Sequence, residues 1–196
     1  DKGPAIAALY AMKAIKELKI PLKKNVRLIL GSDEECGSSD LDYYYSIEEE
    51  APMTFTPDAD FPVINIEKGR LSKEFRVSFE KDSALPRIIS AQGGEKSNVV
   101  PGTAKAAVQG FDIDLLEKKA QETAKTTGAT FSLIQEKETI TISCRGKAAH
   151  ASAPEGGNNA LTALLTFLSS LPAADSVGFK KLKAVAKLFP HGDHQG

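Results

Sequence analysis

The stretch VRLILGSDEECG, residues 26–37, joins an apolar run to three consecutive acidic side chains. The run Val26–Leu30 ends at Gly31, and a short apolar segment closed by a turn residue is typical of a buried strand. Residues 33–35 would then follow the carboxyl end of that strand, where open α/β sheets bind their ligands. Because adjacent carboxylates repel one another, we expect a divalent cation there, with one carboxylate left to carry protons.

A second short stretch repeats this arrangement. Residues 53–56 end in Pro57 and Asp58. If this strand neighbours the first one in a parallel sheet, Glu35 and Asp58 converge at the same end of the sheet. Two simpler alternatives stay open. Asp58 can merely open a turn with Pro57, and Glu34 and Glu35 can belong to a solvated turn.

Composition excludes several classes of protein. The 196 residues, of which 41% are hydrophobic and 26% charged, match an ordinary globular chain of one or two domains. The net charge of −1 argues against nucleic acid and anionic membranes as partners. We find neither a signal-peptide pattern nor an apolar run of membrane-spanning length. Cys36 and Cys144 are far apart in the sequence and could pair, but we expect reduced thiols and a cytoplasmic location.

Periodicity predicts two differently organised parts that meet near Glu67. Residues 1–66 alternate helix and strand, which predicts a portion of an α/β domain with a partial parallel sheet. Residues 67–196 follow the order strand, helix, strand, strand, helix, which predicts an α+β unit of the ferredoxin-like kind. We expect helices over residues 4–20, 38–45, 113–125 and 158–171, and strands over 26–30, 53–56, 74–80, 103–109, 131–134 and 139–144, with another near 88–89.

Three further segments carry candidate site residues. His150 lies among small residues in Gly146–Pro154, where a ligand could approach closely, although a lone histidine is more often structural. Asn98 could hydrogen-bond a substrate, or it could only shape a turn. His191–His194 suggests a metal site, but its glycine and its lack of periodic support favour a surface loop.

Taken together, these motifs resemble the di-zinc exopeptidases that include bacterial Xaa-His dipeptidases of the PepV type, carnosinases, aminoacylases and acetylornithine deacetylases. The resemblance spans most of the chain. The matching segments, in the family's order, are Asp1–Pro4, Gly31–Glu35, Thr56–Asp58, Asn98–Pro101 and Gly146–Pro154.

The resemblance implies a metal-dependent hydrolase of dipeptides. Glu34 would be the general base and acid beside two zinc ions, for which manganese or cobalt could substitute. Glu35 and Asp58 would each bind one metal ion, His150 would stabilise the oxyanion, and Asn98 would contact the peptide substrate. Residues 1–66 would belong to the catalytic domain, and residues 67–196 to a truncated lid domain.

The resemblance also implies ligands that this chain lacks. The family's bridging aspartate would fall immediately before Asp1, and a further histidine ligand would lie beyond Gly196. The chain therefore resembles an internal fragment, which we expect to bind zinc weakly and to be inactive alone. Two alternatives remain open, a deacylase or desuccinylase of N-acyl amino acids and a non-catalytic binding or dimerisation domain. The oligomeric state is not predicted.

Overall fold

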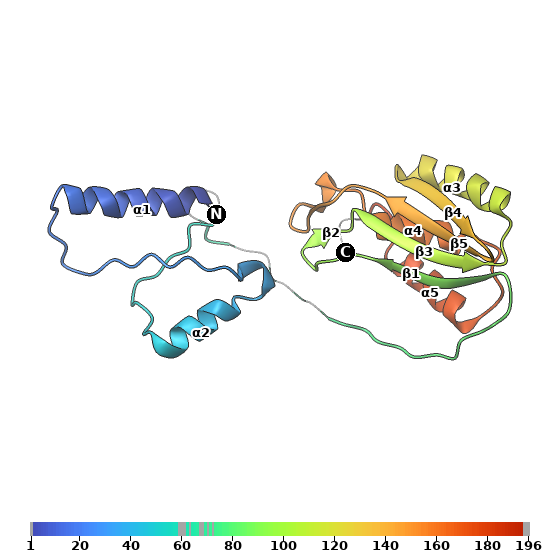
Figure 1. Ribbon diagram of the computed structural model, residues 1–196, viewed down its shortest axis with the longest axis horizontal. Coiled ribbons are helices and arrows are strands. Elements are labelled where there is room, and N and C mark those ends of the chain that lie inside the picture. The colour runs from blue at the N-terminus through green and yellow to red at the C-terminus, as the bar shows by residue number, and fades with distance from the viewer. Residues whose placement is uncertain are drawn as a thin grey trace. The chain divides into compact units, whose positions relative to one another are not determined.

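The computed structural model describes residues 2–58, 62, 64–66, 69, 71 and 73–193. Asp1, Glu67 and His194, on which some of the sequence predictions fall, lie outside these residues. The chain divides into two compact units, Asp1–Lys73 and Glu74–Gly196, whose elements are labelled in Figure 1. None of the helices in the described part of the chain has the length and apolar character needed to cross a membrane.

The first unit consists of helices and irregular segments. Helix α1 spans Lys2–Glu17 and α2 spans Ser39–Ile47, and a short 3-10 turn, η1, covers Glu34–Cys36 between them. Both predicted helices are therefore confirmed, with shifts of a few residues at their ends. No described residue of this unit is buried. The apolar side chains of α1 thus have no core beneath them.

The strands predicted over residues 26–30 and 53–56 are not formed, and the described residues of the first unit contain no sheet. The prediction of a partial parallel sheet in this part of the chain was wrong for the structure observed. A strand is stable only when a neighbouring strand pairs with its N–H and C=O groups. No such neighbour is present among the described residues, and Val26 and Leu30 remain 52% and 71% exposed.

The second unit contains an antiparallel sheet of four strands in the order β1-β3-β5-β4. Strand β1 is Arg87–Gly93, β3 is Thr103–Gln109, β4 is Thr130–Glu136 and β5 is Thr139–Arg145. A separate two-stranded sheet pairs β2, Val99–Val100, with β6, Ala149–His150. The predicted strands 103–109, 131–134 and 139–144 are confirmed, and so is the strand near 88–89.

Side-chain alternation explains which face of the larger sheet is buried. Every second residue of β3 and β5 points into the core, as expected for strands with one buried face. These residues form cross-strand pairs on one face of the sheet. The pairs are Ala104 with Cys144, Ala106 with Ile142, and Val108 with Ile140.

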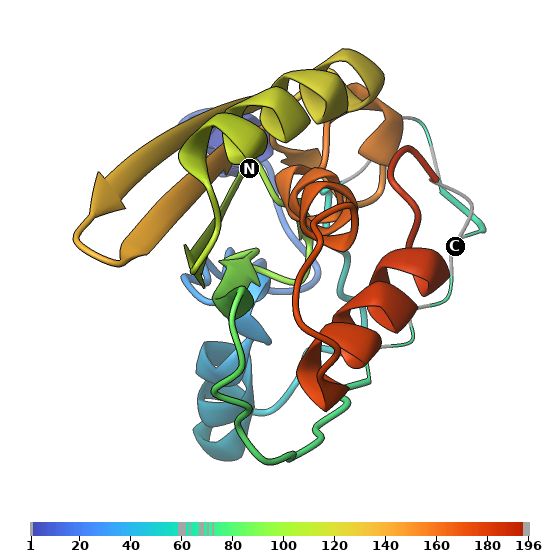
Figure 2. The same cartoon turned by 90° about the vertical axis from the view of Figure 1, so that its right-hand side faces the viewer.

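Three helices complete this unit: α3, Ile113–Thr127; α4, Ala160–Ser169; and α5, Val177–Leu188. Helix α4 lies between α3 and α5 (Figure 2). Asp112 caps the start of α3, because its carboxylate accepts from the Leu115 N–H at 2.9 Å. Gly128, in the left-handed conformation, follows the last residue of the helix. Phe167 of α4 is fully buried, and its ring lies 5.3 Å from that of Phe131.

The predicted strand over residues 74–80 is also absent, because the described residues provide no strand beside it. Phe75 is 93% exposed, whereas the ring of Phe79 lies against Gly178 at the start of α5. Helix α5 was not predicted. Its signals are Ser176, whose hydroxyl accepts from the Phe179 N–H at 3.1 Å, and the apolar spacing that follows.

Candidate functional site

Glu34 and Glu35 occupy the 3-10 turn η1 and are exposed. The preceding carboxylate, Asp33, has a structural role, because its Oδ2 accepts from the backbone N–H of Ser39 at 3.0 Å and also from the Ser39 hydroxyl. Asp33 thus stabilises the start of α2, whose N-cap residue Ser38 makes no capping hydrogen bond with its own side chain. The acidic triplet therefore divides into one structural carboxylate and the pair Glu34 and Glu35.

A second carboxylate holds the other side of this turn. Asp40 Oδ2 accepts from the Ser32 N–H at 2.5 Å, and this backbone hydrogen bond is the main reason why the pKa of the Asp40 carboxyl is lowered. Asp33 and Asp40 together tie residues 31–40 into a closed loop that presents Glu34 and Glu35 at its surface.

Asp58, the other proposed metal ligand, lies in an irregular segment and is exposed. Within the described residues, no three histidine, cysteine or acidic side chains are gathered in a group that could hold a metal ion. Glu35 and Asp58 are oxygen donors of the kind that divalent cations bind. Their donor chemistry therefore fits a metal ion, but their number does not complete a coordination shell. The convergence of Glu35 and Asp58 remains a prediction.

Asn98 and His150 are brought together in the second unit. Val99 pairs with His150 across the β2–β6 ladder, and the N–H of Ala151 donates to the carbonyl oxygen of Asn98 at 2.8 Å. The two residues are distant in the sequence, yet a two-stranded sheet makes them neighbours. Asn98 is half-buried and His150 is exposed, so this ladder presents both at an accessible edge of the unit.

The His150 ring is held by Ser152. Its Nδ1 lies 2.7 Å from the Ser152 hydroxyl oxygen and 3.2 Å from the Ser152 backbone nitrogen, which donates to it. Ser152 was not singled out from the sequence. The segment Gly146–Pro154 was recognised, but small residues around a histidine do not reveal which of them turns back onto the ring.

The base of the His150 segment is closed by a reciprocal bridge. Lys147 N–H donates to Asn158 O, and Asn158 N–H donates to Lys147 O, both at 2.8 Å. The 3-10 turn η2, Pro154–Gly156, lies between β6 and this bridge. Asn159 then begins α4 by accepting from the backbone N–H groups of Leu161 and Thr162. An asparagine pair before an apolar helix was the available sequence signal for this cap.

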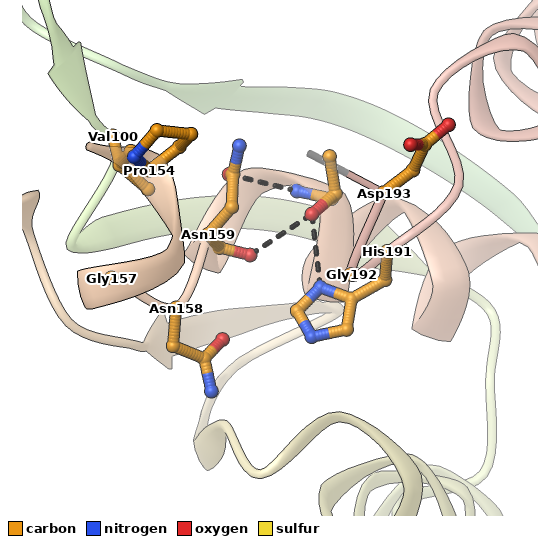
Figure 3. A pocket seen from close by; sticks show the side chains of 9 residues that line it. Val100, Pro154, Gly157, Asn158, Asn159, His191, Gly192 and Asp193 are labelled. Carbon is orange, nitrogen blue, oxygen red and sulfur yellow. Dashed lines mark hydrogen bonds between the residues drawn. The ribbon is translucent and has the colours of Figure 1, made fainter. Parts of the chain in front are cut away.

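A shallow pocket of about 340 Å³ lies beside this bridge (Figure 3). His191 is on its wall, with Nε2 3.1 Å from the carbonyl oxygen of Thr127 and Nδ1 2.9 Å from the Thr162 hydroxyl. Asn158 Nδ2 donates to the same Thr127 oxygen at 2.9 Å, whereas its Oδ1 is buried without a partner among the described residues. His191 therefore fastens the segment after α5 to the end of α3. The other lining residues are Val100, Pro154, Gly157, Asn159, Gly192 and Asp193.

The similarity of this chain to known proteins covers much more of the sequence than this site. The model of "Peptidase family M20/M25/M40" matches residues 1–173. A protein named "Putative dipeptidase YtjP" from Bacillus subtilis (strain 168) is 34% identical over 198 residues, which cover 100% of this chain and 42% of that protein. A "Beta-Ala-Xaa dipeptidase" from Lactobacillus delbrueckii subsp. lactis is 35% identical over 173 residues, which cover 86% of this chain and 36% of that protein.

The chain spans about two fifths of the length of these curated relatives. The family model extends over most of the chain and both units, from the α1 segment to the end of α4. The resemblance inferred from the sequence motifs is thereby confirmed at the level of the family. This chain belongs to peptidase family M20/M25/M40.

Proposed function

We propose that this chain is part of a metal-dependent dipeptidase that hydrolyses short peptides with a free N-terminus. The family and the names of the relatives support peptide hydrolysis. The observation that carries the proposal is the β2–β6 ladder, which joins Asn98 to His150 through the Val99–His150 pair and the Ala151–Asn98 hydrogen bond. Two residues to which the family resemblance gives roles in substrate binding and catalysis are thus neighbours.

In the second unit, His150 supplies a hydrogen-bond donor. Peptide hydrolysis places negative charge on the former carbonyl oxygen, and a preorganised N–H donor stabilises that charge. The side-chain amide of Asn98 hydrogen-bonds the peptide. In this proposal residues 67–196 form the lid domain, of ferredoxin-like topology, and the order β3, α3, β4, β5, α4 supports that assignment.

In the first unit, Glu34 carries the proton. A glutamate at the surface of a loop fixed by Asp33 and Asp40 can accept a proton from the attacking water and deliver it to the leaving amine. Glu35 and Asp58 would each hold one divalent metal ion, zinc in the first instance and manganese or cobalt as substitutes. Bound zinc polarises the scissile carbonyl and acidifies water.

The proposal includes an expectation about this chain alone. Zinc prefers four ligands, and the described residues gather no group of three. We therefore expect the 196-residue chain to bind zinc weakly and to show no peptide hydrolysis. Dipeptidase activity measured on the purified chain would contradict this expectation. A cytoplasmic location belongs to the same proposal, supported by the free thiols of Cys36 and Cys144.

The decisive experiment is zinc titration with dipeptide hydrolysis on the full-length protein and its Glu34→Gln variant. The variant should keep its metal and lose about 10²–10⁴-fold in kcat, as expected when a general acid–base is removed. Glu49→Gln, at an exposed acidic residue of the same unit, should turn over normally. Normal turnover by Glu34→Gln would reject Glu34 as the base. Hydrolysis of N-acyl amino acids but not of dipeptides would favour the deacylase alternative.

A further inference from the structure

We propose that Ser152 is a positioning residue that holds the His150 ring as its Nε2–H tautomer and aims that N–H at the substrate. The inference deepens the function proposed above and rests on it, because it says which ring nitrogen of the neutral His150 donates to the oxyanion. Its structural basis is the pair of contacts that Ser152 makes with Nδ1, through its hydroxyl at 2.7 Å and its backbone nitrogen at 3.2 Å.

The backbone contact decides the tautomer. A hydroxyl can donate or accept, so the Ser152 Oγ contact alone fits either state of Nδ1. A backbone N–H can only donate, and the Ser152 N–H points at the same nitrogen. Nδ1 must therefore carry the lone pair and act as acceptor. The hydroxyl then donates to Nδ1 as well, and in the neutral ring the proton is on Nε2.

The orientation of the ring is fixed from two directions. Pairing with Val99 holds the His150 backbone, and a turn in which the Ala153 N–H donates to the His150 carbonyl at 3.0 Å brings Ser152 back over the ring. An exposed side chain without such a contact would sample several rotamers. Ser152 thus restricts both the direction of the His150 ring and the identity of its donor nitrogen.

The tautomer matters because the two states of Nε2, with and without its proton, have opposite effects on a developing alkoxide. Nε2–H donates a hydrogen bond to it, whereas a bare Nε2 presents a lone pair and repels it. The Ser152 backbone N–H contributes one net hydrogen bond to this preference, because the hydroxyl can pair with either tautomer. A hydrogen bond of ordinary strength corresponds to about a 2- to 13-fold change in the ratio of the two tautomers.

Nuclear magnetic resonance of the ¹⁵N-labelled 196-residue chain tests the proposal without reference to activity. The ¹⁵N shifts of the two ring nitrogens report the tautomer, and His150→Gln assigns the signals. Wild-type His150 should be mainly Nε2–H. Ser152→Pro, which removes the backbone donor, should lower the ratio of Nε2–H to Nδ1–H about 2- to 13-fold, whereas Ser152→Ala, which keeps that donor, should not lower it. Ser132→Ala, at an exposed β4 position, should leave it unchanged.

An unchanged ratio in Ser152→Pro overturns the proposal. Turnover of the full-length protein then separates this proposal from the proposed function. If both hold, kcat of Ser152→Pro falls in proportion to the fraction of His150 that remains in the Nε2–H form, and His150→Gln loses about 10²–10³-fold in kcat. If the tautomer shifts but His150→Gln turns over normally, Ser152 positions the ring and the catalytic role of His150 fails. If His150→Gln is inactive and the tautomer ratio and kcat of Ser152→Pro stay at wild-type values, the positioning role fails.

Discussion

Substituting Gly146 by alanine should destabilise the second unit strongly. A Cβ atom at this position would overlap the carbonyl oxygen of Asn158 and lie 3.0 Å from its carbonyl carbon and 3.1 Å from the Ala160 nitrogen. All three are backbone atoms, so none can rotate away as a side chain would. Ala160 is also fixed in place, because its N–H donates to the Pro101 carbonyl at 2.7 Å.

The expected cost follows from what must move. Forcing a methyl group into a packed junction costs about 1–3 kcal/mol. Displacing Asn158 also breaks up to two hydrogen bonds with Lys147, each contributing about 0.5–1.5 kcal/mol. We therefore expect Gly146→Ala to lower the free energy of unfolding by about 1–6 kcal/mol, a large part of the stability of a typical domain.

Gly156→Ala is the matched control. Its Cβ would meet only the Ala149 methyl group at 4.0 Å, so the variant should match wild type or gain about 0.4–1 kcal/mol from the stiffer unfolded chain. The free energy of unfolding of both variants is measured by urea denaturation, with hydrogen exchange of the β5 amides as the probe. This probe reports the second unit, whereas all four tyrosines lie within residues 10–45 of the first. Equal stability of the two variants, within about 0.5 kcal/mol, would refute the reasoning.

Two further predictions concern single side chains of the second unit. Asp112→Ala should cost about 0.5–2 kcal/mol because it removes the hydrogen bond to the Leu115 N–H, and Asp114→Ala on the first turn of α3 is its control in urea denaturation; equal effects would contradict the cap. Burial raises the pKa of the Cys144 thiol from 9.0 to about 11, so iodoacetamide at pH 8 should modify the exposed Cys36 and spare Cys144. As the pH rises, the Cys144 thiol ionises in the unfolded chain before it does so in the folded one. The free energy of unfolding should therefore decrease from about pH 9 towards pH 11, which pH-dependent denaturation measures. Rapid labelling of Cys144 by iodoacetamide would contradict its burial.

Local patterns predicted the second unit well. Strand β3 was predicted with the observed ends and helix α3 with the observed start, because strand patterns and helix caps are properties of neighbouring residues. The same reasoning failed at residues 26–30 and 74–80. An apolar or alternating stretch indicates only which side chains favour burial, whereas a strand also requires a hydrogen-bonding neighbour.

The candidate site was predicted in part. The composition around His150 marked the segment, and the structure places it beside Asn98. The pairing itself was not predicted, because a ladder of two residues per strand has too short a pattern to detect. The contact of Ser152 with the ring depends on a turn, which the sequence does not specify.

Strand β1 forms one border of the antiparallel sheet, and its register with β3 shifts between Ile88 and Ser90. A strand from another molecule can add only to an evenly spaced row of N–H and C=O groups, and a bulge interrupts that row. Strand β4, at the opposite border, pairs regularly with β5 along its whole length. Intermolecular sheet extension, the first step of fibrous aggregation, should therefore be disfavoured at β1, and concentrated samples would need protection at the β4 border instead.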